Sequence, residues 1–424
     1  MTTQFVLAGN GPNSNRGCEA ILRGTVEILR RAFGECRFIN VYNPQPESSN
    51  TPSETDPDIE SRPLNRMELS KGLKCNSGFQ RFLPYRFRRK FIIRETADVL
   101  FRGLESYVLE SEAVLSIGGD NYTLDYGQPY TFMAIDEFAK RCHRPLIIWG
   151  ASIGPFHKDP DFEKLIIPHL KHDVTAIYFR EEQSYRYLKT AGLGPNLHRM
   201  ADPAFVMPPG SVSDEQLGFS LPEQAIGVNL SPMLAGYAFE GDKARWMSSA
   251  ISIVERIVKD FRLPVILIPH VTTATSDDHV FMKSIYENLT GHHRQLFLAP
   301  RSLTASQTKG LISRLRCLVA ARTHATIASF STRVPALSLA YSTKAFGLNE
   351  RLFGHHDFVV PPEALGPEAV IQGIRLLLQR EPEIREQLNR RIPQEIQLAF
   401  EAGENLKRVL TSSTTTCNSS TLTT

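Results

Sequence analysis

A chain of 424 residues exceeds what a single hydrophobic core usually organises, so two domains are expected. Its 42% apolar and 22% charged residues are ordinary for a globular protein, and a net charge of +3 is too small to indicate a nucleic-acid-binding protein. No apolar run reaches the roughly 20 residues of a membrane-spanning helix. The N-terminus lacks the basic and long apolar parts of a secretory signal. We therefore expect a cytoplasmic protein.

In the first half of the chain, short apolar runs end in polar or glycine-rich tips, and helical patterns follow several of them. Such alternation predicts a parallel sheet with helices on both faces. The predicted strands are residues 4–8, 37–41, 113–117, 145–149 and 176–179. Helical patterns cover residues 20–32 and 181–190, and Gly192 is expected to stop the second of these helices.

Two stretches interrupt this pattern. Residues 43–77, rich in Pro, Ser, Asn and charge, are interpreted as a long surface insertion. The basic and aromatic segment 79–94 follows it. We favour a helix that covers a domain edge for this segment, although contact with an anionic lipid or a long acceptor is an alternative that leaves peripheral membrane association open.

A second alternating series begins after residues 208–210. Thr304 and Gln307 have the spacing of a capping box at the start of a helix. The tail 411–424 is of low complexity, which predicts disorder. The simplest architecture is two doubly wound domains, 1–207 and 208–410. The predicted strands and helix of the second series are residues 225–230, 264–268, 318–321, 335–340 and 243–261.

The triplet Arg322-Thr323-His324 is the most informative motif. It follows a buried strand and opens a helix, so it is expected at the carboxyl edge of a parallel sheet, where open α/β sheets bind ligands. An arginine, an imidazole and a helix N-terminus together suit a small anion that needs a proton. The alternative is a surface helix cap beside an ordinary loop histidine.

Other strand ends carry further candidates. Gly118 and Gly119 allow close backbone approach, and Asp120 adds a carboxylate that could hold a sugar hydroxyl, act as a base or simply cap a helix. Arg180 directly follows an apolar strand, which favours an anionic ligand. An ion pair with Glu181, Glu182 or Asp202 is the competing explanation for Arg180.

The remaining tips give weaker signals. The loop after the first strand lacks both the dinucleotide and the Walker patterns, but Asn15 could lie close to a ligand. Asn229 and His270 also follow strands, with a structural histidine as the default for His270. The segments 277–279 and 355–357 only superficially look like metal-ligand clusters, and exposed polar loops explain both. The six scattered cysteines lack metal-type spacing, so no metal is predicted.

Taken together, these segments resemble the polysaccharide pyruvyl transferase family. The resemblance covers residues 5–355 in the same order along the chain. The matching segments are 15–21, 116–120, 150–155, 180–184, 202–205, 322–325 and 335–344. It implies two Rossmann-like domains that face a cleft, in a fold similar to glycosyltransferase-B. It also implies transfer of a pyruvate ketal group from phosphoenolpyruvate to a sugar, as in exopolysaccharide biosynthesis, with no further cofactor.

The resemblance assigns Arg180, Arg322 and His324 to the donor site. His324 is the predicted proton donor, because an unperturbed histidine pKa near 6.5 suits proton transfer at neutral pH. Lys344 is expected near the donor phosphate, and Asp120 is expected to orient or deprotonate the acceptor. One departure is Cys18, where many members of the family have aspartate.

The candidate substrate contacts thus include Asn15, Gly118, Gly119, Asn229 and His270. The acceptor sugar, free or lipid-linked, is not specified by the sequence. Two other functions remain open: a nucleotide-sugar-dependent glycosyltransferase, and a non-catalytic glycan- or anion-binding protein on the same fold. The pyruvyl transferase interpretation requires residues 180, 322 and 324 to meet in one pocket between the domains, and guanidinium groups held by internal carboxylates would count against it.

Overall fold

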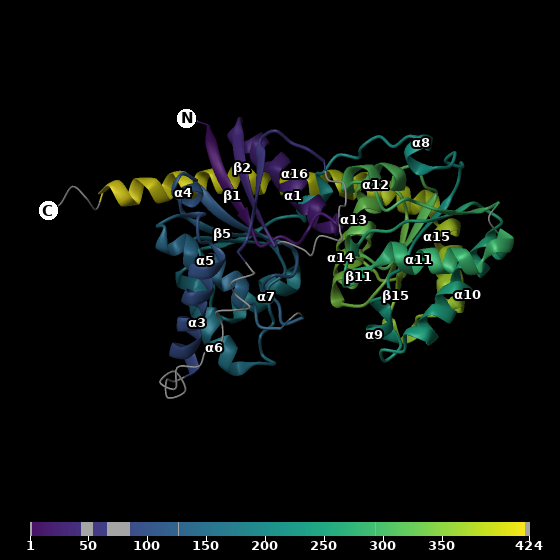
Figure 1. Cartoon of the computed structure of the whole chain (residues 1–424), viewed down its shortest axis with the longest axis horizontal. Helices are drawn as coiled ribbons and strands as arrows, with labels where there is room; N and C mark the ends of the chain where they lie inside the picture. The colour runs from purple at the N-terminus through teal and green to yellow at the C-terminus, as the bar shows by residue number, and fades with distance from the viewer. Residues whose placement is uncertain (1, 44–53, 66–84, 126, 293, 420–424) are drawn as a thin grey trace.

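The computed structural model describes residues 2–43, 54–65, 85–125, 127–292 and 294–419. These residues form two parallel sheets, each flanked by helices, that lie side by side (Figure 1). The predicted α/β class with two doubly wound sheets is confirmed. The first sheet ends at Arg199 and the second begins at Ile226, so the predicted boundary near residue 208 falls between them.

The first sheet has the strand order β3-β2-β1-β4-β5-β6-β7, and every pairing is parallel. Its order reverses between β1 and β4, which places a ligand crevice beyond their carboxyl ends. The strands are β1 Thr3–Ala8, β2 Cys36–Tyr42, β3 Ile59–Pro63, β4 Ala113–Ile117, β5 Leu146–Ala151, β6 Ala176–Phe179 and β7 Leu197–Arg199.

Alternation along β1 shows how this sheet is covered on both faces. Phe5 and Leu7 belong to the core shared with helix α1, whereas Val6 and Ala8 belong to the core under α5. Successive strand side chains point to opposite faces, so a wholly apolar strand needs helices on each side. The helices of this half are α1 Arg16–Phe33, α3 Tyr85–Leu100, α4 Glu105–Leu109, α5 Tyr130–Arg141, α6 Pro160–His172, α7 Glu182–Thr190 and η2 Pro203–Phe205.

The second sheet repeats the arrangement with the order β12-β9-β8-β13-β14-β15, reversing between β8 and β13. A short antiparallel hairpin, β10 with β11, follows β9. The strands are β8 Ile226–Asn229, β9 Val265–Leu267, β10 Thr272–Thr273, β11 Ser276–Asp277, β12 Leu296–Leu298, β13 Cys317–Ala320, β14 Ala336–Leu339 and β15 Val359–Val360.

Two predicted helix-end signals are confirmed. Thr304 caps the amide of Gln307 while the Gln307 side chain accepts from the Thr304 amide, which makes the predicted capping box at α12. Gly192, with φ of +84°, follows the last turn of α7. The other helices of the second half are α8 Asp214–Leu217, α9 Leu234–Ala238, α10 Lys243–Phe261, α11 Asp278–Asn288, η3 Thr290–His292, α12 Ala305–Ile312, α13 Thr323–Ser331, α14 Thr343–Phe353, η4 Pro362–Ala364, α15 Pro367–Gln379 and α16 Glu381–Ser419.

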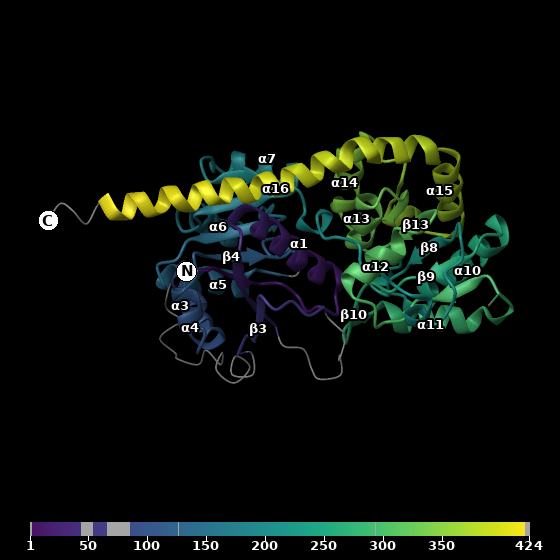
Figure 2. The same ribbon diagram turned by 90° about the horizontal axis from the view of Figure 1, so that it is seen from above.

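The last helix contacts both predicted domains. Helix α16 runs from the second domain back along the first (Figure 2), where Asn405 accepts a hydrogen bond of 2.7 Å from Tyr178 and Lys407 binds the carbonyl of Ala32. Residues 411–419, predicted to be disordered, continue this helix, while 420–424 lie outside the described residues. Neither α16 nor any other described helix is long and apolar enough to cross a membrane.

The 43–77 segment is more than a surface loop. Its residues Ile59–Pro63 form β3, the edge strand paired with β2, and Glu54 contacts Thr304 of the second domain at 2.8 Å. Residues 44–53 and 66–84 lie outside the described part of the chain. The described part of the basic and aromatic segment, 85–94, lies in α3, which packs against α5 as a covering helix. This confirms the favoured interpretation for those residues.

Candidate active site

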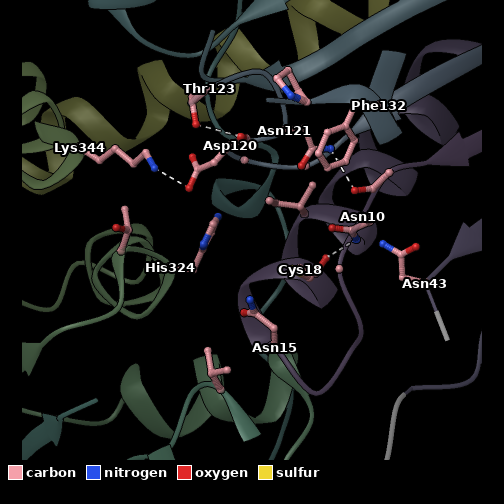
Figure 3. A pocket seen from close by; sticks show the side chains of 18 of the residues that line it. Asn10, Asn15, Cys18, Asn43, Asp120, Asn121, Thr123, Phe132, His324 and Lys344 are labelled. Atoms are coloured by element: carbon pink, nitrogen blue, oxygen red, sulfur yellow. Dashed lines mark hydrogen bonds and ion pairs between the residues drawn. The ribbon is translucent and has the colours of Figure 1, made fainter. Parts of the chain in front are cut away.

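A cavity of about 430 Å³ lies between the domains, where strand-end loops of both sheets face each other (Figure 3). Its volume is typical of a small-molecule site. All of the predicted site residues except Asn229 line it. These residues are Asn15, Gly118, Gly119, Asp120, Arg180, His270, Arg322, His324 and Lys344. The convergence that the interpretation requires is therefore present.

Asp120 joins the two domains at the centre of the cavity. Its carboxylate binds Lys344 of α14 at 2.5 Å and the Nη2 of Arg180 at 3.1 Å. Burial alone would raise the pKa of Asp120, but the Lys344 and Arg180 charges lower it below its usual value. Asp120 is consequently a stable carboxylate, better suited to orienting a partner than to removing a proton.

Arg180 confirms the ion-pair alternative left open by the sequence. Its guanidinium binds the carboxylates of Asp202 and Asp120, and its Nε lies 3.2 Å from the Ser152 hydroxyl. Burial would raise the pKa of Asp202, yet the neighbouring Arg180 charge keeps that pKa well below its usual value. A Cβ on Gly119 would lie 2.9 Å from Arg180 Nη2, so glycine leaves the room that this guanidinium needs.

His324 lies in the first turn of α13 with its ring against the first domain. Its Nε2 is 3.5 Å from a carboxylate oxygen of Asp202, and this buried nitrogen has no hydrogen-bond partner among the described residues. A Cβ on Gly17 of α1 would lie only 2.5 Å from His324 Nδ1. Gly17 therefore lets the N-terminal turns of two helices from different domains meet at the imidazole.

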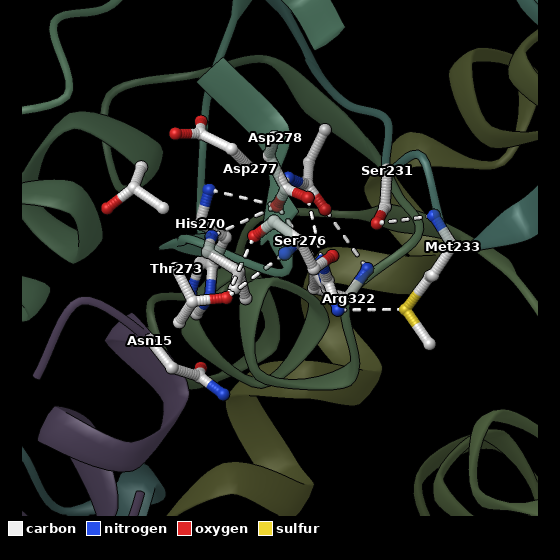
Figure 4. A network of polar contacts seen from close by, with 12 residues as sticks. Asn15, Ser231, Met233, His270, Thr273, Ser276, Asp277, Asp278 and Arg322 are labelled. Carbon is white, nitrogen blue, oxygen red and sulfur yellow. Dashed lines mark hydrogen bonds and ion pairs between the residues drawn. The ribbon is translucent and has the colours of Figure 1, made fainter. Parts of the chain in front are cut away.

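Arg322 is held by a buried carboxylate that sequence reasoning missed. Asp278 binds Arg322 Nη2 at 2.8 Å, and Ser276 accepts from the same nitrogen at 2.7 Å (Figure 4). The Nη1 atom faces the sulfur of Met233, a weak acceptor. Both arginines of the predicted donor site thus have internal carboxylate partners. This arrangement is the one that counts against the interpretation, so direct donor binding by Arg180 and Arg322 is not favoured by the geometry and stays a prediction.

Asp278 also corrects the interpretation of residues 277–279 as an exposed loop. Asp278 is fully buried and accepts from the Val271 amide at 3.0 Å. The sequence did hold a signal for such a partner. An arginine such as Arg322 at the end of a buried strand requires a carboxylate or a ligand. Asn229, also fully buried, accepts from the Arg322 amide at 3.0 Å and supports the loop from below the cavity.

His270 lies at the base of the cavity and is almost completely buried. Burial, followed by the nearby His324 and Arg322 charges, lowers the pKa of His270 well below its usual value, so its imidazole is neutral. Its Nδ1 has no hydrogen-bond partner among the described residues. His270 therefore differs from the default expectation, which was a structural histidine with both ring nitrogens hydrogen-bonded.

Two helix N-termini are directed to the second-domain side of the cavity. Helices α13 and α14 begin after Arg322 and Ser342, and neither of these residues caps its helix with a side-chain hydrogen bond. Thr323, His324 and Lys344 in their first turns line the cavity. Exposed amide groups at helix N-termini, with a lysine beside them, favour an anion.

The loop before α1 has a mainly structural role. Asn15 caps α1 by accepting from the Gly17 amide at 3.0 Å. Arg16 forms a buried ion pair of 2.8 Å with Glu19, which in turn accepts from the Ala305 amide of the second domain. Cys18 stands where many members of the family have aspartate. Burial raises the pKa of the Cys18 thiol to about 12, so this side chain is uncharged.

Two Rossmann-like domains with a polar cleft between their switch points define the glycosyltransferase-B class of fold. A sequence model of the family "Polysaccharide pyruvyl transferase" matches residues 15–343, most of the chain. The chain belongs to the polysaccharide pyruvyl transferase family and is a transferase. No curated protein matches it in sequence.

Solved structures agree on the fold. The UDP-GlcNAc 2-epimerase of Neisseria meningitidis, bound to UDP-GlcNAc, is 13% identical with a TM-score of 0.55 over 97% of this chain and 100% of that one. A putative UDP-N-acetylglucosamine 2-epimerase from Listeria monocytogenes is 12% identical, with a TM-score of 0.55 over 91% and 90%. Medicago truncatula UGT71G1, complexed with UDP-glucose, is 8% identical with a TM-score of 0.56 over 96% and 98%. At these low identities the matches show the fold and nothing further.

Proposed function

We propose that the protein transfers a pyruvyl group from phosphoenolpyruvate to two hydroxyls of a sugar, forming a cyclic ketal and releasing phosphate. Family membership supports pyruvylation of a polysaccharide or its precursor. The observation that carries the choice of donor is the cationic side of the cavity, where His324 and Lys344 lie beside two helix N-termini without side-chain caps.

Phosphoenolpyruvate has a carboxylate and a phosphate close together, so its site needs several donors from different directions. The first-turn amides of α13 and α14 can supply neutral donors, and Lys344 supplies a charge. Because Lys344 also binds Asp120 at 2.5 Å, the anion competes with an internal carboxylate. We infer that this competition keeps the donor from being bound as a dead-end complex.

In the reaction, His324 donates a proton to the methylene carbon of phosphoenolpyruvate, and the neighbouring carbon becomes electrophilic. A first sugar hydroxyl attacks that carbon, and its proton goes to the now neutral His324 imidazole. A second hydroxyl then displaces phosphate at the same carbon and closes the ring, and the proton of this hydroxyl leaves with the phosphate. We assign the proton transfer to the His324 imidazole, which lines the cavity and has its Nε2 3.5 Å from the Asp202 carboxylate.

The arginines act in this scheme by holding other groups in place. Arg180 fixes Asp202 next to the imidazole and Asp120 next to Lys344. Arg322 anchors the start of α13 through Asp278. Positioning of this kind determines rate because small displacements of reacting groups are costly in catalysis.

A second candidate is a nucleotide-sugar-dependent transferase, favoured by the fold shared with proteins solved with UDP-GlcNAc and UDP-glucose. Thermal unfolding separates the two, since a ligand stabilises the state that binds it. We expect phosphoenolpyruvate to raise the Tm and UDP-sugars to leave it unchanged. A Tm raised only by UDP-sugars would replace the proposal with the second candidate.

A non-catalytic binding protein is tested by turnover. Phosphate release from phosphoenolpyruvate should require both the protein and an acceptor glycan. A panel of oligosaccharides with vicinal or 4,6-related hydroxyls is the appropriate set of acceptors, because these pairs can close a cyclic ketal. Stabilisation by phosphoenolpyruvate without phosphate release with any acceptor of the panel would favour a binding protein.

A further inference from the structure

The first-domain side of the same cavity differs chemically from the cationic side. Three neighbouring strands, β2, β1 and β4, are each followed by an asparagine at the carboxyl edge of the sheet: Asn43, Asn10 and Asn121. All three line the cavity (Figure 3). We call Asn10, Asn43, Asn121 and the adjacent Phe132 the amide wall.

We infer that the amide wall binds one pyranose ring of the acceptor glycan, with the Asn10 and Asn43 side-chain oxygens accepting hydrogen bonds from its hydroxyls and Phe132 covering an apolar face. This inference rests on the proposed function, because it supplies the second substrate of that reaction.

Two carbonyl oxygens of the wall are left without partners. The Oδ1 atoms of Asn10 and Asn43 are buried and have no hydrogen-bond partner among the described residues. Asn10 Nδ2 donates to the Cys18 carbonyl at 2.8 Å, which fixes the amide so that its oxygen is the remaining group. A buried acceptor without a donor is costly, so a ligand or water hydroxyl is expected there.

The third amide has a different task. Asn121 Nδ2 donates to the carbonyls of Gly9 at 3.0 Å and of Ile117 at 2.9 Å. It therefore ties the loop after β1 to the loop after β4. These two hydrogen bonds hold the loop that carries Asn10 in a fixed position relative to the loop that carries Asp120.

Phe132 supplies a flat apolar surface beside the amides of the wall. Its ring is half-buried on α5 and lies 6.0 Å from the ring of Tyr122, centroid to centroid. A Cβ on Gly9 would lie 3.3 Å from Phe132 Cδ1, so the glycine gives the ring its place at the cavity edge. An apolar face beside hydrogen-bonding amides matches a pyranose, which carries C–H groups on its faces and hydroxyls at its rim.

The charges of the two sides support the same division. Amides and Phe132, beside the neutral Cys18 thiol, make the amide wall uncharged, whereas the first-domain charges that line the cavity, Asp120 and Arg180, are paired with each other. An anion would find no unpaired cation at the amide wall, whereas a neutral sugar can bind there without burying a charge. The cationic side then remains for the anionic donor. Asp120, between the two sides, is the carboxylate that a reacting hydroxyl would meet.

The test uses saturation-transfer-difference NMR on the full-length protein without phosphoenolpyruvate. The probes are the methyl β-glycosides of galactose, glucose, mannose and N-acetylglucosamine. We expect saturation transfer to at least one probe, with binding weakened about 3- to 10-fold in Asn43→Ala and in Phe132→Leu, as for loss of one neutral hydrogen bond or part of one contact surface. The matched controls Asn288→Ala and Phe87→Leu lie outside the cavity and should bind as the wild type does.

The result that would overturn the inference is absence of saturation transfer from every probe, which would mean that only water occupies the amide wall. Equal binding in wild type and both amide-wall variants would overturn it as well. Failure of the proposed function has a different signature: sugar binding that depends on Asn43 and Phe132, in a protein whose Tm does not respond to phosphoenolpyruvate.

Discussion

Two histidine–aspartate groups in this protein make an instructive pair. His169 of α6 has both ring nitrogens engaged, Nε2 with the fully buried Asp136 at 2.8 Å and Nδ1 with Asp173 at 3.2 Å. His324 lies 3.5 Å from Asp202, and its Nε2 has no hydrogen-bond partner among the described residues. The first arrangement is complete without a ligand, and the second is not.

The surroundings explain the difference. His169 and Asp136 lie between α5 and α6, where Tyr122 also donates to Asp136 at 2.7 Å. His324 instead lies at the meeting point of two domains, against Gly17 and beside a cavity. A histidine with a closed set of partners stabilises a fold, whereas one with an unused nitrogen at a cavity is available for proton transfer.

The largest effect is expected from His324→Ala. Loss of a general acid typically costs about 10²- to 10⁴-fold in rate, and the Tm should stay near that of the wild type because Asp202 keeps its buried ion pair with Arg180. Acceptor-dependent phosphate release and thermal unfolding measure the two quantities. His198→Ala, a half-buried histidine on β7 outside the cavity, is the control and should keep its activity. A His324→Ala protein with near-normal turnover would contradict the assignment.

His169→Gln should have the opposite profile. Removing one partner leaves the buried Asp136 charge uncompensated, and breaking such a pair costs roughly 3–5 kcal/mol. We expect a clearly lower Tm but normal activity per folded molecule at low temperature. Large loss of turnover in a stable His169→Gln protein would show that the two histidines are not separated in role.

The same variant gives a pH signature. Burial would lower the pKa of His169, but the hydrogen bonds that its ring donates to Asp136 and Asp173 raise it to about 9. A folded-state pKa above the unfolded value means that the stabilisation is complete below pH ~6.5 and is lost as pH rises through about 9. The Tm difference between wild type and His169→Gln should therefore shrink across that range. A constant difference would contradict the charged pair.

Lys344→Gln tests the cationic side of the cavity. A charge-assisted hydrogen bond to the donor is worth about 1.5–3 kcal/mol, so the KM for phosphoenolpyruvate should rise about 10- to 100-fold. The exposed Lys259→Gln on α10 is the control. If the KM for phosphoenolpyruvate stayed unchanged, Lys344 would be only an internal partner of Asp120.

Gly17→Ala should give the smallest effect of this set. A Cβ 2.5 Å from His324 Nδ1 must displace the imidazole, so we expect kcat to fall about tenfold while the KM for phosphoenolpyruvate changes little. Gly236→Ala, on α9 with open space around the position, controls for the added methyl group. Unchanged kcat in Gly17→Ala would mean that the ring position is not critical.

Much of this architecture could be predicted because local patterns determine it. Apolar runs that end in polar tips identified the buried parallel strands, and the Thr304 and Gln307 spacing identified a helix start. The strand-end rule predicted Arg180 at the edge of the first sheet and Arg322 and His324 at the edge of the second, and the family resemblance implied that the two edges face one cleft.

What could not be predicted depends on contacts between distant segments. Nothing local to Asp278 indicates that Arg322 lies above it, and nothing local to Asp202 indicates that it lies between Arg180 and His324. The predicted second domain, 208–410, includes most of α16, because nothing local to that segment indicates that it lies along the first domain. Whether the Asn10 and Asn43 oxygens have a hydrogen-bond donor likewise depends on tertiary contacts, which the neighbouring sequence does not indicate.

Mass spectrometry of a glycan incubated with the protein and isotopically labelled phosphoenolpyruvate gives the decisive result. We predict that the acceptor gains the labelled three-carbon unit as a ketal with wild-type protein, and that the His324→Ala protein yields no such product. An acceptor panel left without label by a wild-type protein that binds both substrates, or labelled equally by His324→Ala, would contradict the assignment.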